Sequence, residues 1–160
     1  MLQKPRPGQG ALFFLEAGSR ELRGPLEPVP GAPGTGPVAA ADGSRVVGWT
    51  VNPADEKSSL LYAVDVRESK VLYRKELPRP LPVAIGSNQQ EAWDFRTGPD
   101  GWIWTFLDGV LSRIDPSTDR FCPLGRPPAA GRIAFSGGRL YLGGGTSLRR
   151  VKGLALPGIR

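Results

Sequence analysis

The chain has 160 residues, a formal net charge of +6, one cysteine and no histidine. The missing histidine excludes a Ser-His-Asp triad, a Cys-His pair and a zinc site with histidine ligands, and the single Cys122 excludes an internal disulfide. The sequence has no run of 18 apolar residues and no signal peptide, so we expect no transmembrane span and assign no compartment.

Four short turns, each followed by a strand-like run, stand out along the chain. The turns are rich in Gly and Asp, which tolerate the positive φ that tight hairpins require, and the runs are rich in β-branched and aromatic residues. In chain order they are GQG (8–10) before ALFFL (11–15), ADG (41–43) before RVVGW (45–49), GPDG (98–101) before WIWTF (102–106), and SGG (136–138) before RLYLG (139–143).

Further strands follow these runs. Two of the repeated units share the order apolar strand, Asp, turn, strand, with Asp65 and Asp115 at the ends of the first strands. Pro, Ser, Thr and Asp in the second of these turns favour a type I turn with side-chain hydrogen bonds to the backbone. The predicted strands are 60–66 and 70–77 in one unit, 110–115 and 120–124 in the next, and 147–151 in the last.

The spacing of the turns predicts a repeat architecture. The glycines at corresponding positions, Gly10, Gly43, Gly101 and Gly138, are 33, 58 and 37 residues apart, and two polar insertions at 52–58 and 86–91 account for the long interval. A blade of a β-propeller needs about 40 to 45 residues. We therefore predict an all-β chain of antiparallel four-stranded blades in a partial or small ring, one domain over 1–160 with units at 8–34, 35–82, 83–128 and 129–160.

Two motifs carry a family resemblance. GPDGWIW at 98–104, followed by LSRIDP at 111–116, resembles the blade signature of streptogramin-lyase-like propellers of bacteria. LYAVD at 61–65 with KVLY at 70–73 resembles a blade of the pyrroloquinoline-quinone-like repeat proteins. The resemblance covers about residues 35–151 and implies a propeller fold. It implies no catalytic residue, because the lyases use a histidine and the quinone enzymes use a cysteine pair, which this chain lacks.

Aromatic and acidic residues supply the candidate binding residues. Trp93 and Trp104 lie near the third turn and serve either as core between blades or as an aromatic floor with Arg96 as polar partner. Asp55 and Glu91 lie in the two expected insertions, where propeller loops bind ligands. No Asp-x-Asp-x-Asp spacing occurs, so we predict no metal site, no cofactor and no catalytic residue.

Two functions from different classes fit these residues. The first is a non-catalytic propeller module that binds a protein partner or associates with itself to complete a ring. The alternative is a metal-dependent lyase, lactonase or hydrolase with carboxylates in a central channel, so enzymatic activity stays open. The basic residues form no run of five or more, and we expect a solvated basic surface rather than nucleic-acid binding.

Overall fold

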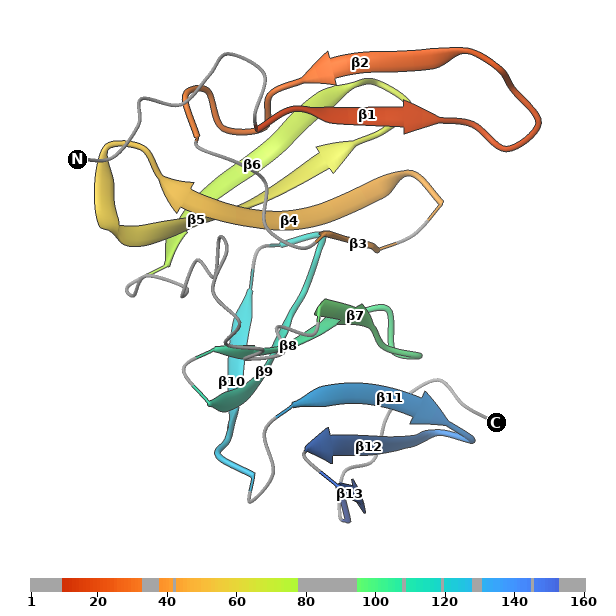
Figure 1. The fold of residues 1–160 in the computed structure, drawn as a ribbon, viewed down its shortest axis with the longest axis vertical. Coiled ribbons are helices and arrows are strands. Elements are labelled where there is room, and N and C mark those ends of the chain that lie inside the picture. Colours follow the sequence, from red (N-terminus) through yellow and green to blue (C-terminus); the bar gives the residue numbers. More distant parts are fainter. Residues whose placement is uncertain are drawn as a thin grey trace. The chain divides into compact units, whose positions relative to one another are not determined.

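The computed structural model describes residues 10–32, 38–41, 43–77, 95–107, 109–118, 120–127, 131–144 and 146–152. Within these ranges every regular element is a β-strand, and all strand pairs are antiparallel (Figure 1). The prediction of an all-β chain with antiparallel sheets is confirmed; among the described residues two of the sheets have four strands, one has three and one has two. The chain divides into two compact units, residues 1–83 and 84–160.

Unit 1 contains a two-stranded and a four-stranded sheet, in which neighbours in the sequence are neighbours in space. The hairpin consists of β1 (Leu12–Leu15) and β2 (Leu22–Leu26), and the larger sheet of β3 (Val38–Ala40), β4 (Arg45–Asn52), β5 (Asp55–Asp65) and β6 (Lys70–Leu77). The core between them buries Tyr62 and Val64 of β5 against Val29, with Leu12 and Phe14 of β1 packed on it. Burial raises the pKa of the Tyr62 hydroxyl, which therefore stays neutral.

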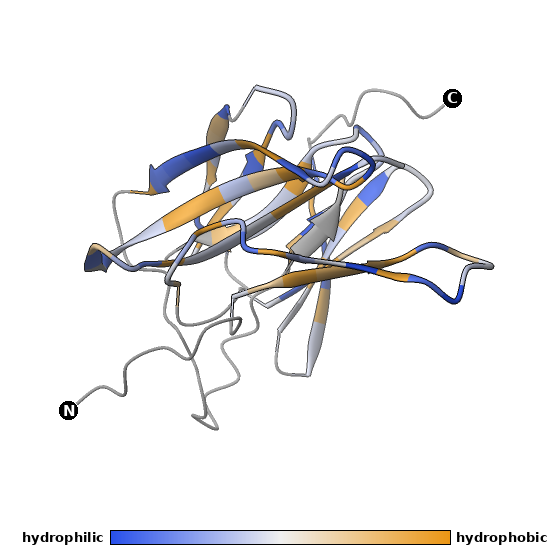
Figure 2. Cartoon of the chain, turned by 90° about the horizontal axis from the view of Figure 1, so that it is seen from above, coloured by the Kyte–Doolittle hydropathy of each residue, from blue (hydrophilic) through white to orange (hydrophobic). Residues whose placement is uncertain are grey.

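Unit 2 contains a four-stranded and a three-stranded sheet, again in sequential order. Their strands are β7 (Phe95–Thr97), β8 (Ile103–Leu107), β9 (Val110–Ile114) and β10 (Phe121–Gly125), then β11 (Arg132–Ser136), β12 (Arg139–Gly144) and β13 (Ser147–Arg150). The two sheets share one core, made by Trp104, Phe106 and Leu111 from the first and by Ile133, Leu140 and Leu142 from the second. Hydrophilic and hydrophobic residues alternate along many of the strands (Figure 2), as expected for sheets with one buried face.

The four predicted runs overlap observed strands, and the predicted turns at 98–101 and 136–138 lie in observed hairpins, while the turns at 8–10 and 41–43 include residues outside the described ranges. The β11–β12 hairpin has a two-residue turn, because Ser136 pairs with Arg139. Its two central residues, Gly137 and Gly138, have φ of 51° and 71°. Positive φ at both positions is what the tight turn requires, and this is why glycine occupies them.

The aspartates at the ends of β5 and β9 hold the turns that follow them. Asp65 Oδ1 accepts hydrogen bonds from the backbone N–H of Arg67 and Glu68 at 2.9 and 3.0 Å. Asp115 accepts from the backbone and hydroxyl of Ser117, at 2.9 and 2.6 Å, and from the Thr118 hydroxyl at 2.8 Å. Partial burial by itself would raise the pKa of Asp115. The hydrogen bonds together outweigh this effect, so the pKa is lowered from its ordinary value.

The prediction that residues 52–58 form a polar inserted loop is wrong. Asn52 ends β4, Asp55 begins β5, and the two residues pair with each other at the tip of a long hairpin. Asn52 Nδ2 donates to the Ser58 hydroxyl at 2.9 Å, which in turn donates to the carbonyl of Asp55. The polar side chains satisfy one another inside regular strands, so polarity alone did not indicate a loop. The second expected insertion, 86–91, lies outside the described residues.

Each of the four predicted units encloses one sheet: β1–β2 lie within 8–34, β3–β6 within 35–82, β7–β10 within 83–128 and β11–β13 within 129–160. The assignment of these sheets to blades of one ring stays a prediction. In the part of the chain that the structure describes, no helix is long and apolar enough to cross a membrane.

Candidate functional site

Three of the five predicted binding residues lie in the described ranges. Trp93 and Glu91 lie outside them. Arg96 and Trp104 are brought together, because they face each other as direct partners on β7 and β8 in unit 2. Asp55 belongs to unit 1, where its carboxylate is exposed and accepts a hydrogen bond from the Lys57 backbone N–H at 3.0 Å. The register thus places Arg96 opposite Trp104, whereas the guanidinium that lies over the Trp104 ring is that of Arg113, 5.9 Å from its centroid.

Trp104 is a core residue. Its side chain is fully buried, and its ring meets the Phe135 ring edge to face, with centroids 5.7 Å apart at 69°. The indole N–H donates to Asp100 Oδ1 at 3.0 Å. The geometry corresponds to the core interpretation of this tryptophan, in which the ring holds two sheets together and is not presented to a ligand.

Asp100 and Arg113 form a partly buried cluster around the two tryptophans. The Asp100 side chain is 1% exposed and Oδ2 lies 3.4 Å from Nη1 of Arg113. The Arg113 guanidinium lies over the Trp102 ring, 4.4 Å from its centroid. A Cβ at Gly98 would collide with the Trp104 indole and the Asp100 carboxylate, so only glycine fits the β7–β8 turn here.

The chemistry of this cluster is structural. Both Asp100 oxygens have partners, since Oδ1 accepts from the Trp104 indole and the Trp102 backbone N–H, and Oδ2 faces Arg113. A buried carboxylate with both oxygens paired anchors the turn. Sequence reasoning did not select Asp100 or Arg113 as a pair, because their contact depends on the register of β8 and β9.

The described residues do not include a group of three or more Asp, Glu, Cys or His side chains arranged to hold a metal ion. Of the two acidic residues predicted to bind a ligand, Glu91 lies outside the described ranges.

The outer face of the β1–β2 hairpin carries an exposed apolar surface, here called the hairpin patch and defined as Phe13, Leu15 and Leu22. These side chains are 56%, 64% and 60% exposed. Leu15 and Leu22 are direct cross-strand partners, and Phe13 lies at a bulge two residues before Leu15. Because side chains alternate across a strand, Leu12 and Phe14 on the other face pack into the unit 1 core.

Charged residues form a polar rim at the turn end of the hairpin patch. Glu16, Arg20 and Glu21 are exposed there. Arg23 pairs with Phe14 and lies on the opposite face, where its Nη1 donates to the Arg67 carbonyl at 3.4 Å. The rim therefore holds two negative side chains and one positive one beside three apolar ones. An apolar centre with a polar rim is the general composition of a protein-binding surface.

Sequence reasoning assigned the run at 11–15 to a strand but did not single out the hairpin patch. A continuous apolar run is typical of a strand buried on both faces. Its occurrence in a hairpin of only two strands is the signal that could have indicated an uncovered face, because such a hairpin has little sheet to cover it.

Comparison with protein-family models, curated proteins and solved structures found no match to this chain. Function is therefore inferred from the described residues and their surfaces.

Proposed function

We propose that the chain is a non-catalytic β-propeller-type binding and assembly module whose hairpin patch binds a protein surface, in the first place that of a second copy. The observation that carries the proposal is the exposure of Phe13, Leu15 and Leu22 by more than half on one face of a hairpin. The opposite face of the same hairpin already packs into a core, so the fold does not require the exposed side chains to be apolar.

Covering the hairpin patch would remove apolar surface from water, which favours association. Complete burial of a Leu or Phe side chain contributes about 1.5 to 3 kcal/mol. Covering the exposed portions of three such side chains therefore contributes roughly 2 to 5 kcal/mol per copy. Phenylalanine adds a large rigid surface at low cost in side-chain entropy, which suits it to the centre of an interface.

The mixed charges of the rim favour a second copy. Glu16 and Glu21 are negative and Arg20 is positive, so the rim carries both signs. In a two-fold dimer the same surface faces itself, and a rim of mixed sign can then place each cation opposite an anion. A rim of one sign would repel its own copy. The open sheet edges of a partial ring would also favour self-association.

The test is the solution mass at several concentrations, measured by light scattering or sedimentation. The chain has a mass of 17.1 kDa, and a dimer has twice this value, about 34 kDa. We expect the wild type to form a dimer whose fraction rises with concentration. A monomer over the whole concentration range would overturn the choice of a second copy.

Substitutions in the hairpin patch test whether this surface forms the dimer interface. The triple variant Phe13→Ser, Leu15→Thr and Leu22→Thr keeps strand-compatible polar residues, so we expect an unchanged fold and a monomer. The matched control is Leu72→Thr, which changes a leucine of β6 that is 43% exposed outside the hairpin patch. The control should remain dimeric. A dimer that survives the triple variant would show that another surface is used.

The metal-dependent lyase, lactonase or hydrolase is not proposed, because no specific observation on the described residues favours it.

A further inference from the structure

The charges of the chain are segregated along the sequence. All 15 acidic residues precede position 120, and residues 120–160 contain eight of the 21 basic residues and no acidic one. The net charge is therefore 13 − 15 = −2 for residues 1–119 and +8 for residues 120–160, which together give +6. The whole positive excess of the protein belongs to the segment that contains the β11–β13 sheet.

The sheet register gathers isolated basic residues on one surface. The face of β11–β13 that packs into the unit 2 core carries Ile133, Leu140 and Leu142. The other face is exposed. Alternation and the register place on it Ala134, Tyr141, Leu148 and four basic residues, here called the basic face: Arg132, Arg139, Arg150 and Lys152.

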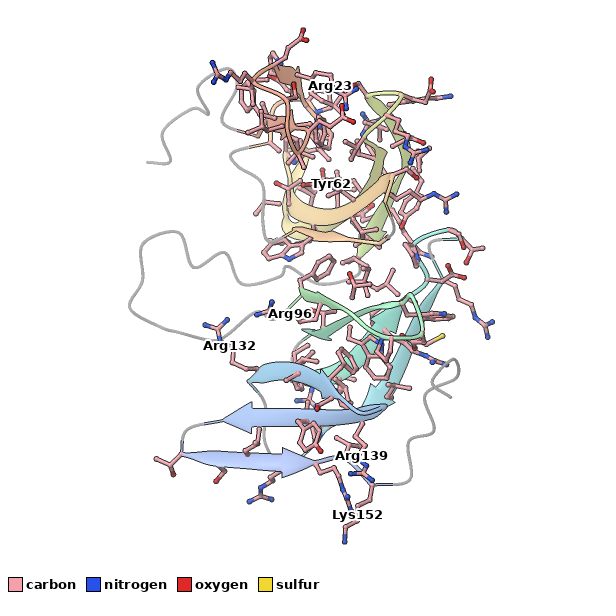
Figure 3. All side chains as sticks on the ribbon, turned by 90° about the vertical axis from the view of Figure 1, so that its right-hand side faces the viewer. Arg23, Tyr62, Arg96, Arg132, Arg139 and Lys152 are labelled. Carbon is pink, nitrogen blue, oxygen red and sulfur yellow. The ribbon has the colours of Figure 1, made fainter. Side chains whose placement is uncertain are left out.

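Two cations of the basic face lie directly beside each other. The Val151 N–H donates to the Leu140 carbonyl at 2.9 Å, which continues the register beyond the end of β13 and places Lys152 opposite Arg139. Figure 3 shows these two side chains together at one end of the sheet and Arg132 at the other. Like charges directly opposite destabilise a sheet, so the pair does not serve the fold, and a bound anion is its natural complement.

An aromatic side chain stands among these cations. Tyr141 is half-buried on the middle strand, with Ala134 and Arg150 as its cross-strand partners. Leu148, on the same face, is 71% exposed. A small neighbour on one side leaves room for a flat ring to stack on Tyr141. Cations that follow a phosphate backbone, combined with an aromatic ring for stacking, are the means by which proteins hold single-stranded nucleic acid.

We propose that the basic face binds single-stranded nucleic acid, with phosphates on its four cations and a base stacked on Tyr141. A flat sheet face does not enter the groove of a duplex as a helix or a two-stranded ribbon does. An acidic peptide or an anionic membrane would use the cations but would not require Tyr141. The proposal uses residues of unit 2 only and is independent of the hairpin patch.

The binding test uses fluorescein-labelled oligo-dT and oligo-U of about 12 nucleotides, a length within the usual range of site sizes. Anisotropy titrations at 50 and 200 mM NaCl give the affinities. Four phosphate contacts predict a logarithmic salt slope of about −2.8, and hence a loss of affinity of about 50-fold between the two salt concentrations. Tighter binding of one oligonucleotide identifies DNA or RNA as the preferred strand. No binding of either at 50 mM would overturn the proposal.

Charge variants locate the site. Arg139→Glu with Arg150→Glu should weaken binding at least tenfold. The matched control, Arg67→Glu with Lys70→Glu in unit 1, makes the same change in net charge and should alter the affinity less than threefold. An equal loss in both pairs would mean that only the total charge matters and would overturn the assignment. The neutral pair Arg139→Gln and Arg150→Gln repeats the test if charge reversal disturbs the fold.

The tyrosine separates nucleic acid from other polyanions. Tyr141→Ala should weaken oligonucleotide binding about 5- to 150-fold, the equivalent of a stacking contribution of about 1 to 3 kcal/mol, and Tyr141→Phe should retain binding. Polyglutamate and vesicles with anionic phospholipid should bind the wild type and Tyr141→Ala equally. If Tyr141→Ala leaves oligonucleotide binding unchanged, or if polyglutamate or the vesicles bind as tightly as the oligonucleotides, the basic face is a general polyanion surface and the proposal fails.

Discussion

In the β1–β2 hairpin of unit 1 the outward positions are occupied by Phe13, Leu15 and Leu22, whereas in the β11–β13 sheet of unit 2 they are occupied mostly by arginine, tyrosine and lysine. The inward residues that pack into a core are apolar in both elements: Leu12 and Phe14 in the hairpin, and Ile133, Leu140 and Leu142 in the sheet. Strand alternation fixes the inner face in each case and leaves the composition of the outer face open. The outer faces are therefore where the two units differ in the interactions they offer.

The two surfaces use forces that respond oppositely to solution conditions. Association through the hairpin patch depends on removing apolar area from water, which dissolved salt does not weaken. Association through the basic face depends on the release of counterions from a polyanion, which salt opposes strongly.

The largest effect is expected on the free energy of unfolding, from substitution of Trp104 in the core of unit 2. Trp104→Ala removes a fully buried ring that contacts Phe135 and bonds Asp100, so unfolding should become easier by about 3 to 5 kcal/mol. Urea unfolding followed by circular dichroism measures this loss. Trp104→Phe, which keeps most of the packing and loses the indole N–H, should cost less. If Trp104→Ala left stability unchanged, the ring would be a ligand surface and not core.

Salt should separate the two associations in a single protein. Raising NaCl from 50 to 200 mM should weaken oligonucleotide binding about 50-fold and leave the dimer fraction unchanged. Anisotropy and sedimentation on the same sample measure the two quantities. A dimer that dissociates over this range would show that charge, and not the hairpin patch, holds the copies together.

A smaller effect distinguishes the aspartate turns of the two units. The lowered pKa of Asp115 means that its carboxylate stabilises the folded state fully above about pH 4, near its ordinary value of 3.8, and loses this contribution as the pH falls through the folded value. Asp115→Asn should therefore lower the Tm at pH 7 by a few degrees, and the difference from wild type should shrink toward pH 2.

The matched control for that substitution is Asp65→Asn in unit 1. Asp65 accepts two backbone hydrogen bonds, whereas Asp115 also accepts two hydroxyl bonds from Ser117 and Thr118. The larger Tm change at pH 7 should therefore occur at Asp115. A difference at Asp115 that stayed constant from pH 7 to pH 2 would contradict the role of its charge.

Addition of divalent metal ions is expected to leave the Tm unchanged. A bound ion stabilises only the folded state, so a metal site would raise the Tm on addition of calcium, magnesium or manganese. For a binding module whose surfaces are apolar and basic we expect no change in Tm with any of the three. A reproducible rise of several degrees would return the metal-dependent lyase, lactonase or hydrolase to consideration.

The sequence predicted the local structure well because local chemistry determines it. Gly137 and Gly138 require the conformation of their turn, and Asp65 and Asp115 bond to backbone groups two and three residues away. The prediction of a loop at 52–58 is wrong because polar residues also occur at the end of a hairpin, where they bond to one another. Their hydrogen bonds across the hairpin end could not be recognised before the pairing of Asn52 with Asp55 was known.

The surfaces were harder to predict because they depend on register and on what covers each face. Arg139 and Arg150 are isolated from each other in the sequence, so a search for basic runs gave them no weight, whereas the sheet brings them to one face. The exclusion of acidic residues from positions 120–160 was readable from the sequence, but its meaning depended on this geometry. The expectation of a merely solvated basic surface and the proposed nucleic-acid site now stand as alternatives that one titration separates.

β13 is also the outer edge of its sheet, and no strand is hydrogen-bonded beyond it among the described residues. Charged side chains on an edge strand discourage the addition of strands from other molecules, and Arg149 and Arg150 make up half of this four-residue strand. The arginine that attracts a polyanion is thus also part of the protection against aggregation. A polyanion bound on Arg150 would therefore also neutralise part of the charge that guards this edge.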